Sequence, residues 1–290
     1  MTFTADAATQ LAPGRSLGTW ETVLASVDNG IAWVVLNRPD KRNCMSPTLC
    51  DEMLEVLDAV ALDDEARVMV LTGAGESWTA GMDLKEFFRE SDALTPAARE
   101  IRQRSCYEWQ GPRLRQFRKP TIAMVNGYCF GGGFVPLANC DLAVAADDAT
   151  FGLSEVNWGI IPGGNVPTAI THTMSLRDAM YYSITGEVFD GRKASEMRLV
   201  NESVPSEQLR DRVVELAEIL KTKNTTVIRG TKETIRGVRN MGWDEAQNYI
   251  DAKSAEALYA DPERGREQGL KQFLDDKSIR PGFNAYRPTN

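Results

Sequence analysis

Short apolar runs alternate with glycine-containing loops and helical segments, and this pattern most constrains what the chain can fold into. One such run is residues 67–72, within "ARVMVLTG". The later stretch "PTIAMVNGYCFGGGFVPLANCDLAVAA" repeats the order strand, loop, helix, strand. A short run that is apolar throughout is typical of a strand covered on both faces. Strands that alternate with helices favour parallel pairing in one sheet. The sequence therefore predicts an α/β fold.

Two local signals near the start of the chain agree with this fold. Asn29-Gly30 lies between two apolar runs, and these residue types supply the positive φ angles of a tight hairpin turn. Ser46 and Pro47 then precede a segment whose apolar residues recur on one helical face. Because serine is a good N-cap and proline fits the first helical position, a helix is expected to begin there.

The second part of the chain has a different pattern. After about residue 200 the apolar residues recur at helical spacing only. We expect a loose leader over 1–18, an α/β core over 19–205 and a helical region over 206–290. The helical region is expected to pack on the core or on another subunit.

Composition and charge exclude several classes of function. The 290 residues carry a formal net charge of -8, which argues against a nucleic-acid surface. No signal-peptide pattern and no apolar run of about 18 residues occurs, so no membrane association and a cytoplasmic location are expected. Five cysteines without a CxxC pair favour reduced, mostly buried thiols over disulfides.

The residue inventory narrows the chemistry further. His172 is the one histidine, which disfavours a serine–histidine triad and a histidine-rich metal site. GxSxG, a complete dinucleotide fingerprint and a P-loop are also missing from the sequence. We therefore expect neither a metal nor a prosthetic group, and chemistry that uses carboxylates and backbone amides.

Two loops could carry that chemistry. One spans residues 77–87, "SWTAGMDLKEF", and the other spans 126–134, "NGYCFGGGF". In the second loop three glycines lead into an expected helix, so free amide hydrogens could face an anion or a developing oxyanion. The alternative is that the glycines only allow close packing of helix and strand.

Five segments together resemble the enoyl-CoA hydratase (crotonase) superfamily, in order and over nearly the whole chain: "LNRPDKRN", "LTGAGESWTAGMDLKEF", "IAMVNGYCFGGGF", "FGLSEVNWGIIPGG" and "GEVFDGRKASEMRLVNESVP". Within it, "WTAGMDLKEFFRE", "FGLSEVNWG" and "QFLDDKSIRPG" look most like the hydroxycinnamoyl-CoA (feruloyl-CoA) hydratase-lyases. The resemblance implies a crotonase-type core of repeated ββα units with a helical oligomerisation region, in a homotrimer or dimer of trimers. It also implies hydration of an aryl-propenoyl-CoA and retro-aldol cleavage to an aromatic aldehyde and acetyl-CoA.

The same resemblance assigns the reacting groups. It implies that the amides of Met82 and Gly132 form an oxyanion hole and that Glu155 is the general acid/base. A carboxylate whose pKa is raised by apolar neighbours can accept a proton in one step and return it in another, as an acid/base catalyst must. The alternative for Glu155 is a structural ion pair.

Coenzyme A, as part of the substrate and product, is implied at two places. Lys41, Arg42 and the Ala80 backbone are expected to bind it, although a solvated turn is the alternative for the two cations. The resemblance further implies that Phe273 and Lys277 reach a CoA site, of the same chain or of a neighbour.

Three positions depart from the hydratase-lyases. Val135 stands where those enzymes carry serine and simple hydratases carry a second glutamate, so Glu155 must act alone. Phe87 and Asp251 stand at positions where the hydratase-lyases present tyrosines to the ring hydroxyl of the substrate. Asp251 could accept a hydrogen bond from a phenol or could be an exposed helix residue, and Tyr249 is a weaker substitute.

These departures leave substrate and reaction open to alternatives. Phe87 and Val135 make the acyl pocket more apolar, and Trp158 is either an aromatic wall of that pocket or a core residue. The rival functions are a hydratase or isomerase of the same fold without C–C cleavage, and a catalytically silent acyl-CoA-binding subunit.

Overall fold

The computed structural model describes residues 10–280, 282 and 284–288. The chain forms two compact units. The first comprises residues up to Phe117 together with Thr121–Ala217, and the second comprises Arg118–Pro120 and the residues from Glu218 onward.

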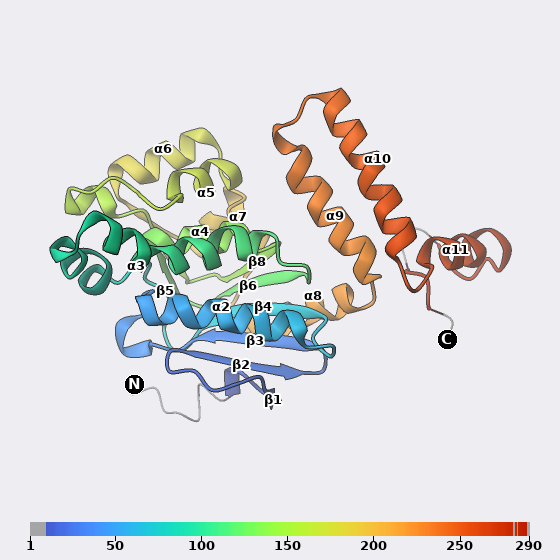
Figure 1. Ribbon diagram of the computed structural model, residues 1–290, viewed down its shortest axis with the longest axis horizontal. Helices are drawn as coiled ribbons and strands as arrows, with labels where there is room; N and C mark the ends of the chain where they lie inside the picture. The colour runs from blue at the N-terminus through green and yellow to red at the C-terminus, as the bar shows by residue number, and fades with distance from the viewer. Residues whose placement is uncertain (1–9, 281, 283, 289–290) are drawn as a thin grey trace. The chain divides into compact units, whose positions relative to one another are not determined.

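The strands of the described chain all lie in the first unit, in two sheets (Figure 1). The larger sheet has the order β1-β2-β3-β4-β6-β8-β11, and the smaller has the order β10-β9-β7-β5. The strands are β1 (Arg15–Ser16), β2 (Val23–Asp28), β3 (Ile31–Leu36), β4 (Val68–Gly73), β5 (Ser77–Thr79), β6 (Thr121–Val125), β7 (Tyr128–Phe130), β8 (Leu142–Ala146), β9 (Thr150–Gly152), β10 (Val188–Asp190) and β11 (Glu202–Val204).

Helices of the first unit surround these sheets. They are α2 (Pro47–Leu62), α3 (Pro96–Glu108), α4 (Phe134–Asn139), α5 (Val166–Thr173), α6 (Leu176–Thr185), α7 (Gly191–Glu196) and most of α8 (Leu209–Lys221). The helices α9 (Thr225–Gly237), α10 (Trp243–Ala260) and α11 (Gly265–Leu270) belong to the second unit.

The local signals of the sequence form the expected elements. β2 and β3 pair antiparallel across Asn29-Gly30, and both turn residues have positive φ. α2 begins at Pro47, and the Ser46 side chain accepts a hydrogen bond from the Leu49 amide. The helix buries one apolar face and contacts β2 and β3, which is the packing that its 3.6-residue periodicity predicts.

The core is built by repeating one unit of structure. A strand of the large sheet is followed by a short strand of the small sheet and then by helix: β4 then β5, β6 then β7, and β8 then β9. From β3 to β11 the large sheet is parallel, and β5, β7 and β9 are parallel in the small one. The predicted α/β fold with repeated ββα units is thus observed.

Because parallel strands end at the same edge of a sheet, this repeat has a functional consequence. Met82 follows β5, Gly132 follows β7 and Glu155 follows β9, and these three strands are neighbours in the small sheet. The topology therefore brings three distant parts of the sequence to one edge.

Two of the expected boundaries differ from the structure. The leader was expected to be loose as far as residue 18, but β1 pairs with β2 and Arg15 forms ion pairs with Asp63 and Glu65. Residues 1–9 lie outside the described part. The units divide at Ala217 rather than after residue 205, because α8 begins against the sheet, where Arg210 stacks 4.1 Å above the Trp33 ring.

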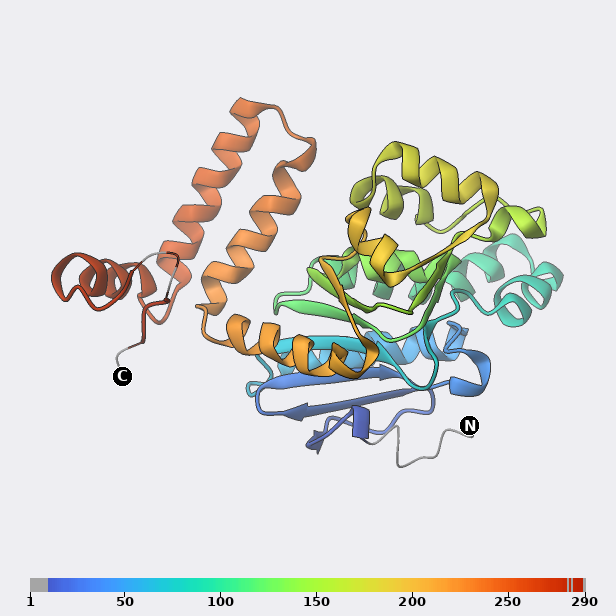
Figure 2. The same ribbon diagram turned by 180° about the vertical axis from the view of Figure 1, so that it is seen from behind.

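The second unit is a helical hairpin followed by a shorter helix. α9 and α10 run side by side, as both views show (Figures 1 and 2). An ionic network joins them, in which Lys253 on α10 contacts Glu233 on α9 at 2.7 Å and Arg229 contacts Glu256 at 3.0 Å. No helix in the described part of the chain is long and apolar enough to cross a membrane.

Candidate active site

A cavity of about 430 Å³ opens at the edge where β5, β7 and β9 end. Its walls come from the loop after β5, the glycine loop after β7, the turn after β9 and one face of α3. Of the residues singled out in the sequence, seven line it: Arg42, Ala80, Met82, Phe87, Gly132, Glu155 and Trp158.

The Met82 amide is turned toward this cavity by strand-like pairing on either side. Met45 N donates to Gly81 O at 2.7 Å, and Asp83 N donates to Met45 O at 3.0 Å. Since those two bonds use the groups that face Met45, the Met82 N–H points away from Met45. Gly81 has a φ of +85°, and a Cβ there would lie 2.5 Å from Phe130 O.

The Gly132 amide lies opposite, in a single 3-10 turn formed by Gly131–Gly133 just before α4. An amide at the start of a helix has no acceptor within that helix. A Cβ added to Gly132 would lie 3.5 Å from Met82 N, so the two amides are close together. That these two amides form an oxyanion hole stays a prediction.

The Asp83 side chain holds the loop that carries Met82 in place. Its carboxylate accepts hydrogen bonds from the amides of Lys85 and Glu86, which caps the following π-helical turn, Leu84–Arg89. Arg38 contacts the same carboxylate at 3.1 Å. Burial alone would raise the pKa of Asp83. The hydrogen bonds from the Glu86 amide, Cys44 and Arg38 have a larger, opposite effect, so the pKa is lowered and the Asp83 carboxylate is ionised.

Glu155 begins a 3-10 turn, Glu155–Trp158, that Gly159 ends in the left-handed conformation. Its Oε2 atom is buried and has no hydrogen-bond partner among the described residues. Its Oε1 atom lies 3.1 Å from the position of a Cβ on Gly131, so the carboxylate faces the glycine loop. Burial raises the pKa of Glu155 above its ordinary value of 4.5.

These facts bear on the two interpretations of Glu155, whose catalytic role stays a prediction. A structural carboxylate would hold a cation or several donors, and its pKa would be lowered. No ion pair of Glu155 is found in the described structure, and its pKa is raised. A buried carboxylate whose pKa is raised holds its proton more readily, which suits acid/base chemistry.

The remaining predicted residues of the first unit divide into two groups. Phe87 is buried and Trp158 is largely exposed, and both line the cavity, so Trp158 is not a core residue. Arg42 lines the mouth, with its guanidinium 5.2 Å from the Tyr128 ring centre. Val135 is buried within α4 and Lys41 is exposed in a short turn, and neither lines the cavity.

Four predicted residues belong to the second unit. Tyr249 packs against Gly237, and Asp251 is exposed and accepts a hydrogen bond from Gln247 at 2.8 Å. Phe273 is partly exposed and Lys277 is exposed. Their expected contacts with substrate stay predictions.

Sequence reasoning missed several lining residues. Tyr128 and Ser154 lie beside residues that were singled out. Gln103, Tyr107 and Gln110 come from α3 and the turn after it, and their i, i+4, i+7 spacing could have indicated a shared face. Among the described residues no cluster of three or more His, Cys, Asp or Glu side chains could hold a metal ion.

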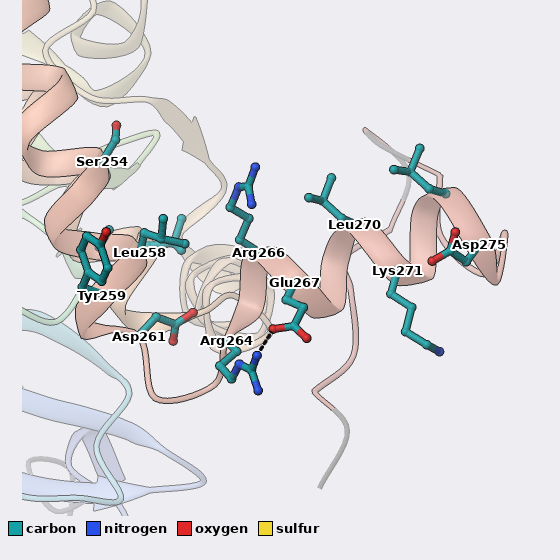
Figure 3. Close-up of a pocket in the computed structure, with 13 residues that line it drawn as sticks. Ser254, Leu258, Tyr259, Asp261, Arg264, Arg266, Glu267, Leu270, Lys271 and Asp275 are labelled. Carbon is teal, nitrogen blue, oxygen red and sulfur yellow. Dashed lines mark ion pairs between the residues drawn. The ribbon is translucent and has the colours of Figure 1, made fainter.

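The second unit carries a separate, more open cavity of about 780 Å³ (Figure 3). Leu258 on α10 and Leu270 and Leu274 near α11 give it apolar walls, and Arg264 forms an ion pair with Glu267 at its rim.

Comparisons with known proteins agree with this geometry. The family model of enoyl-CoA hydratase/isomerase matches residues 26–280. The chain is 55% identical to the hydroxycinnamoyl-CoA hydratase-lyase of Pseudomonas fluorescens, over 93% of this chain and 98% of that protein. It is 32% identical to the (E)-benzylidenesuccinyl-CoA hydratase of Thauera aromatica, over 73% of this chain and 80% of that protein.

A solved structure of an enoyl-CoA hydratase subunit from Geobacillus kaustophilus HTA426 superposes with a TM-score of 0.80. The two chains are 27% identical, and the match covers 91% of this chain and 98% of the other. The crotonase fold predicted from the sequence is confirmed. The chain belongs to the enoyl-CoA hydratase/isomerase family.

Proposed function

We propose that this protein hydrates a hydroxycinnamoyl-CoA thioester and then cleaves the product to an aromatic aldehyde and acetyl-CoA. The similarity to the Pseudomonas fluorescens hydratase-lyase, which spans nearly both chains, supports the reaction. The buried and unpartnered carboxylate of Glu155, facing the glycine loop, is the structural observation that carries the mechanism.

In the hydration step, Glu155 takes a proton from water, and the hydroxide adds to Cβ of the propenoyl chain. The electron pair of the double bond moves onto the thioester, and the resulting enolate oxygen accepts hydrogen bonds from the Met82 and Gly132 amides. Glu155 then gives the proton to Cα. Because one carboxylate performs both transfers, no second acid is needed at Val135.

In the cleavage step, Glu155 takes the proton from the β-hydroxyl group. The Cα–Cβ bond breaks, the aldehyde leaves, and the bonding pair forms the enolate of acetyl-CoA in the same oxyanion hole. Protonation of that enolate at Cα by Glu155 gives acetyl-CoA and regenerates the carboxylate. Both steps therefore develop charge at one oxygen, which preorganised amides stabilise without rearrangement.

CoA would bind at the cavity mouth, where Arg42 is a cation and the Ala80 backbone lies beside Met82. Phosphate groups favour such a guanidinium. Lys41, in the neighbouring turn, would contribute at longer range. Phe273 and Lys277 would reach a CoA site of the same chain or of a neighbouring subunit.

We also propose a homotrimer or a dimer of trimers. α9 and α10 contain no buried residue within one chain, and Trp243 and Tyr259 on α10 are 94% and 89% exposed. Apolar surface of this extent is expected to be covered by another subunit. Light scattering coupled to gel filtration tests this, and a monomer would contradict it. A cytoplasmic location remains a prediction from the sequence.

The reaction is tested with feruloyl-CoA, 4-coumaroyl-CoA, cinnamoyl-CoA and crotonyl-CoA. Loss of the conjugated thioester is followed by absorbance, while aldehyde and acetyl-CoA are quantified by chromatography. Equal amounts of aldehyde and acetyl-CoA from an aryl substrate are expected. A β-hydroxyacyl-CoA that persists would indicate a hydratase without lyase activity, and intact thioester with measurable binding would indicate a silent subunit.

A further inference from the structure

One side chain of the cavity has an unused polar group that the proposed mechanism does not employ. Gln110 is 2% exposed and lines the cavity, yet its Oε1 atom is buried and has no hydrogen-bond partner among the described residues. A buried acceptor without a donor is costly, and such a group at a cavity wall is expected to serve a ligand.

The orientation of the Gln110 amide is fixed by a chain of contacts that ends at the oxyanion loop. Its Nε2 donates to the Cys106 sulfur at 3.0 Å, and the Cys106 thiol donates to the Met82 sulfur at 3.4 Å. In this contact Nε2 donates and the Cys106 sulfur accepts. Oε1 is then the free polar atom of Gln110.

The backbone at Gln110 is also held in place. Gln110 lies in a π-helical turn, Trp109–Arg113, where Gly111 departs from helical φ and ψ and Pro112 follows. Asn139 on α4 donates to the Gln110 carbonyl at 2.8 Å. A side chain with a fixed backbone and one fixed amide nitrogen is preorganised to present its remaining oxygen.

The surroundings of Gln110 indicate what it would bind. Phe87 is buried in the same cavity and offers no polar atom, and Leu84 and Phe88 add apolar surface. Gln103 and Tyr107, on the same helical face, are more exposed, and Tyr107 Oη already contacts Gln103 Oε1 at 3.5 Å. Gln110 is therefore the most buried of the three polar side chains on this face.

We propose that Gln110 determines specificity by accepting, at Oε1, a hydrogen bond from the ring hydroxyl of a hydroxycinnamoyl-CoA substrate. This inference rests on the proposed function. It gives the ring hydroxyl a partner within the first unit, where Phe87 supplies none. An unhydroxylated ring would leave Oε1 unpaired, so the site discriminates by the cost of that unpaired acceptor.

The test compares Gln110→Met with Gln116→Met, the same change at an exposed glutamine that does not line the cavity. Dissociation constants are measured by calorimetry for two saturated thioesters that cannot be hydrated, 3-(4-hydroxyphenyl)propionyl-CoA and 3-phenylpropionyl-CoA. Gln110→Met is expected to weaken binding of the hydroxylated compound by about tenfold or more and to leave the other within about threefold. Gln116→Met should change neither dissociation constant.

Kinetics of 4-coumaroyl-CoA and cinnamoyl-CoA with the same variants give the second readout, and kcat/KM is expected to fall for the hydroxylated substrate alone. Equal losses with both compounds, or no loss with either, would overturn the proposal. If the wild type binds the analogues but produces no aldehyde, the proposed function fails while the binding ratio still tests Gln110. If Gln110→Met does not fold, Gln110→Asn replaces it, because the shorter side chain withdraws the oxygen by one methylene. This variant is expected to show the same selective loss with the hydroxylated compounds.

Discussion

The two walls of the active-site cavity are built in different ways. The wall that carries the Met82 and Gly132 amides rests on backbone pairing and on buried polar side chains such as Asn43 and Thr79. The wall that carries Glu155 is a short turn with exposed apolar neighbours: Trp158 is 68% exposed and Ile161 is 86% exposed. The first wall depends on where the backbone lies, and the second depends on one carboxylate.

The largest effect is expected on the second wall, from Glu155→Gln. The amide keeps the shape of the side chain but cannot exchange a proton, so kcat should fall about a thousandfold. Steady-state assay of aldehyde formation measures it. The variant should still fold, because Oε2 makes no hydrogen bond in the described structure that would be lost.

The control for this change is Glu207→Gln, since Glu207 is an exposed carboxylate outside the cavity. It should leave kcat within about twofold of the wild type. A Glu155→Gln variant that retained more than about a tenth of the activity would show that another group transfers the proton.

The same carboxylate predicts a pH dependence of the rate. Burial raises the pKa of Glu155, and hydration needs its ionised form. We expect kcat/KM to fall about tenfold per pH unit below this pKa and to level off above it. A profile that stayed flat from pH 8 down to the ordinary value of 4.5 would contradict a raised pKa at the base.

Stability should respond in the opposite direction. Because the folded-state pKa of Glu155 is raised, the folded protein holds this proton more tightly than the unfolded chain does. Its contribution to the free energy of unfolding is therefore present below pH 4.5 and is lost as pH rises through the folded pKa. Denaturant unfolding of the wild type and Glu155→Gln should show the wild type losing stability relative to the variant over that window.

On the first wall, Gly81→Ala is expected to have the next largest effect. A Cβ at Gly81 would lie 2.5 Å from Phe130 O and 3.0 Å from Gly132 N, and the backbone has a φ of +85°. The substitution should move the two amides apart, lower kcat about 10- to 100-fold and cost about 1–2 kcal/mol of stability. Kinetic assay and denaturant unfolding measure the two effects.

Gly163→Ala is the matched control, because Gly163 lines the same cavity but has no atom within 4 Å of its Cβ position. If Gly81→Ala left kcat unchanged, the position of the Met82 amide would not matter and the comparison of the two walls would fail.

The sequence predicted one wall more completely than the other. The Gly131–Gly133 run and the position of Glu155 after a strand are local patterns, and the repeated strand order places them at one edge. The family resemblance supplied their roles. Nothing local indicated that Val135 would be buried within α4 or that Lys41 would lie outside the cavity, because both outcomes depend on tertiary packing.

Gln110 is a further residue whose role could not be predicted from local sequence. Its helical spacing with Gln103 and Tyr107 was present in the sequence, but the turn at Gly111 and the hydrogen bond to the Cys106 sulfur decide which polar atom is left free. Those are products of the fold. The leader behaves similarly, since the pairing of β1 with β2 joins two short segments that no local pattern connects.

The smallest effect is expected at the cavity mouth, beyond either wall. Arg42 lines the mouth and stacks on Tyr128, whereas Lys41, its neighbour in sequence, does not reach the cavity. Arg42→Ala should raise KM for the thioester a few-fold with little change in kcat, and added salt should reduce the difference, because the contact is an exposed charge interaction. Lys41→Ala should change KM by less than about twofold.

If both variants raised KM equally, CoA would be held by the net charge of the turn rather than by a placed guanidinium. A kcat effect at Arg42 would instead mean that the mouth helps to align the thioester with the Met82 and Gly132 amides.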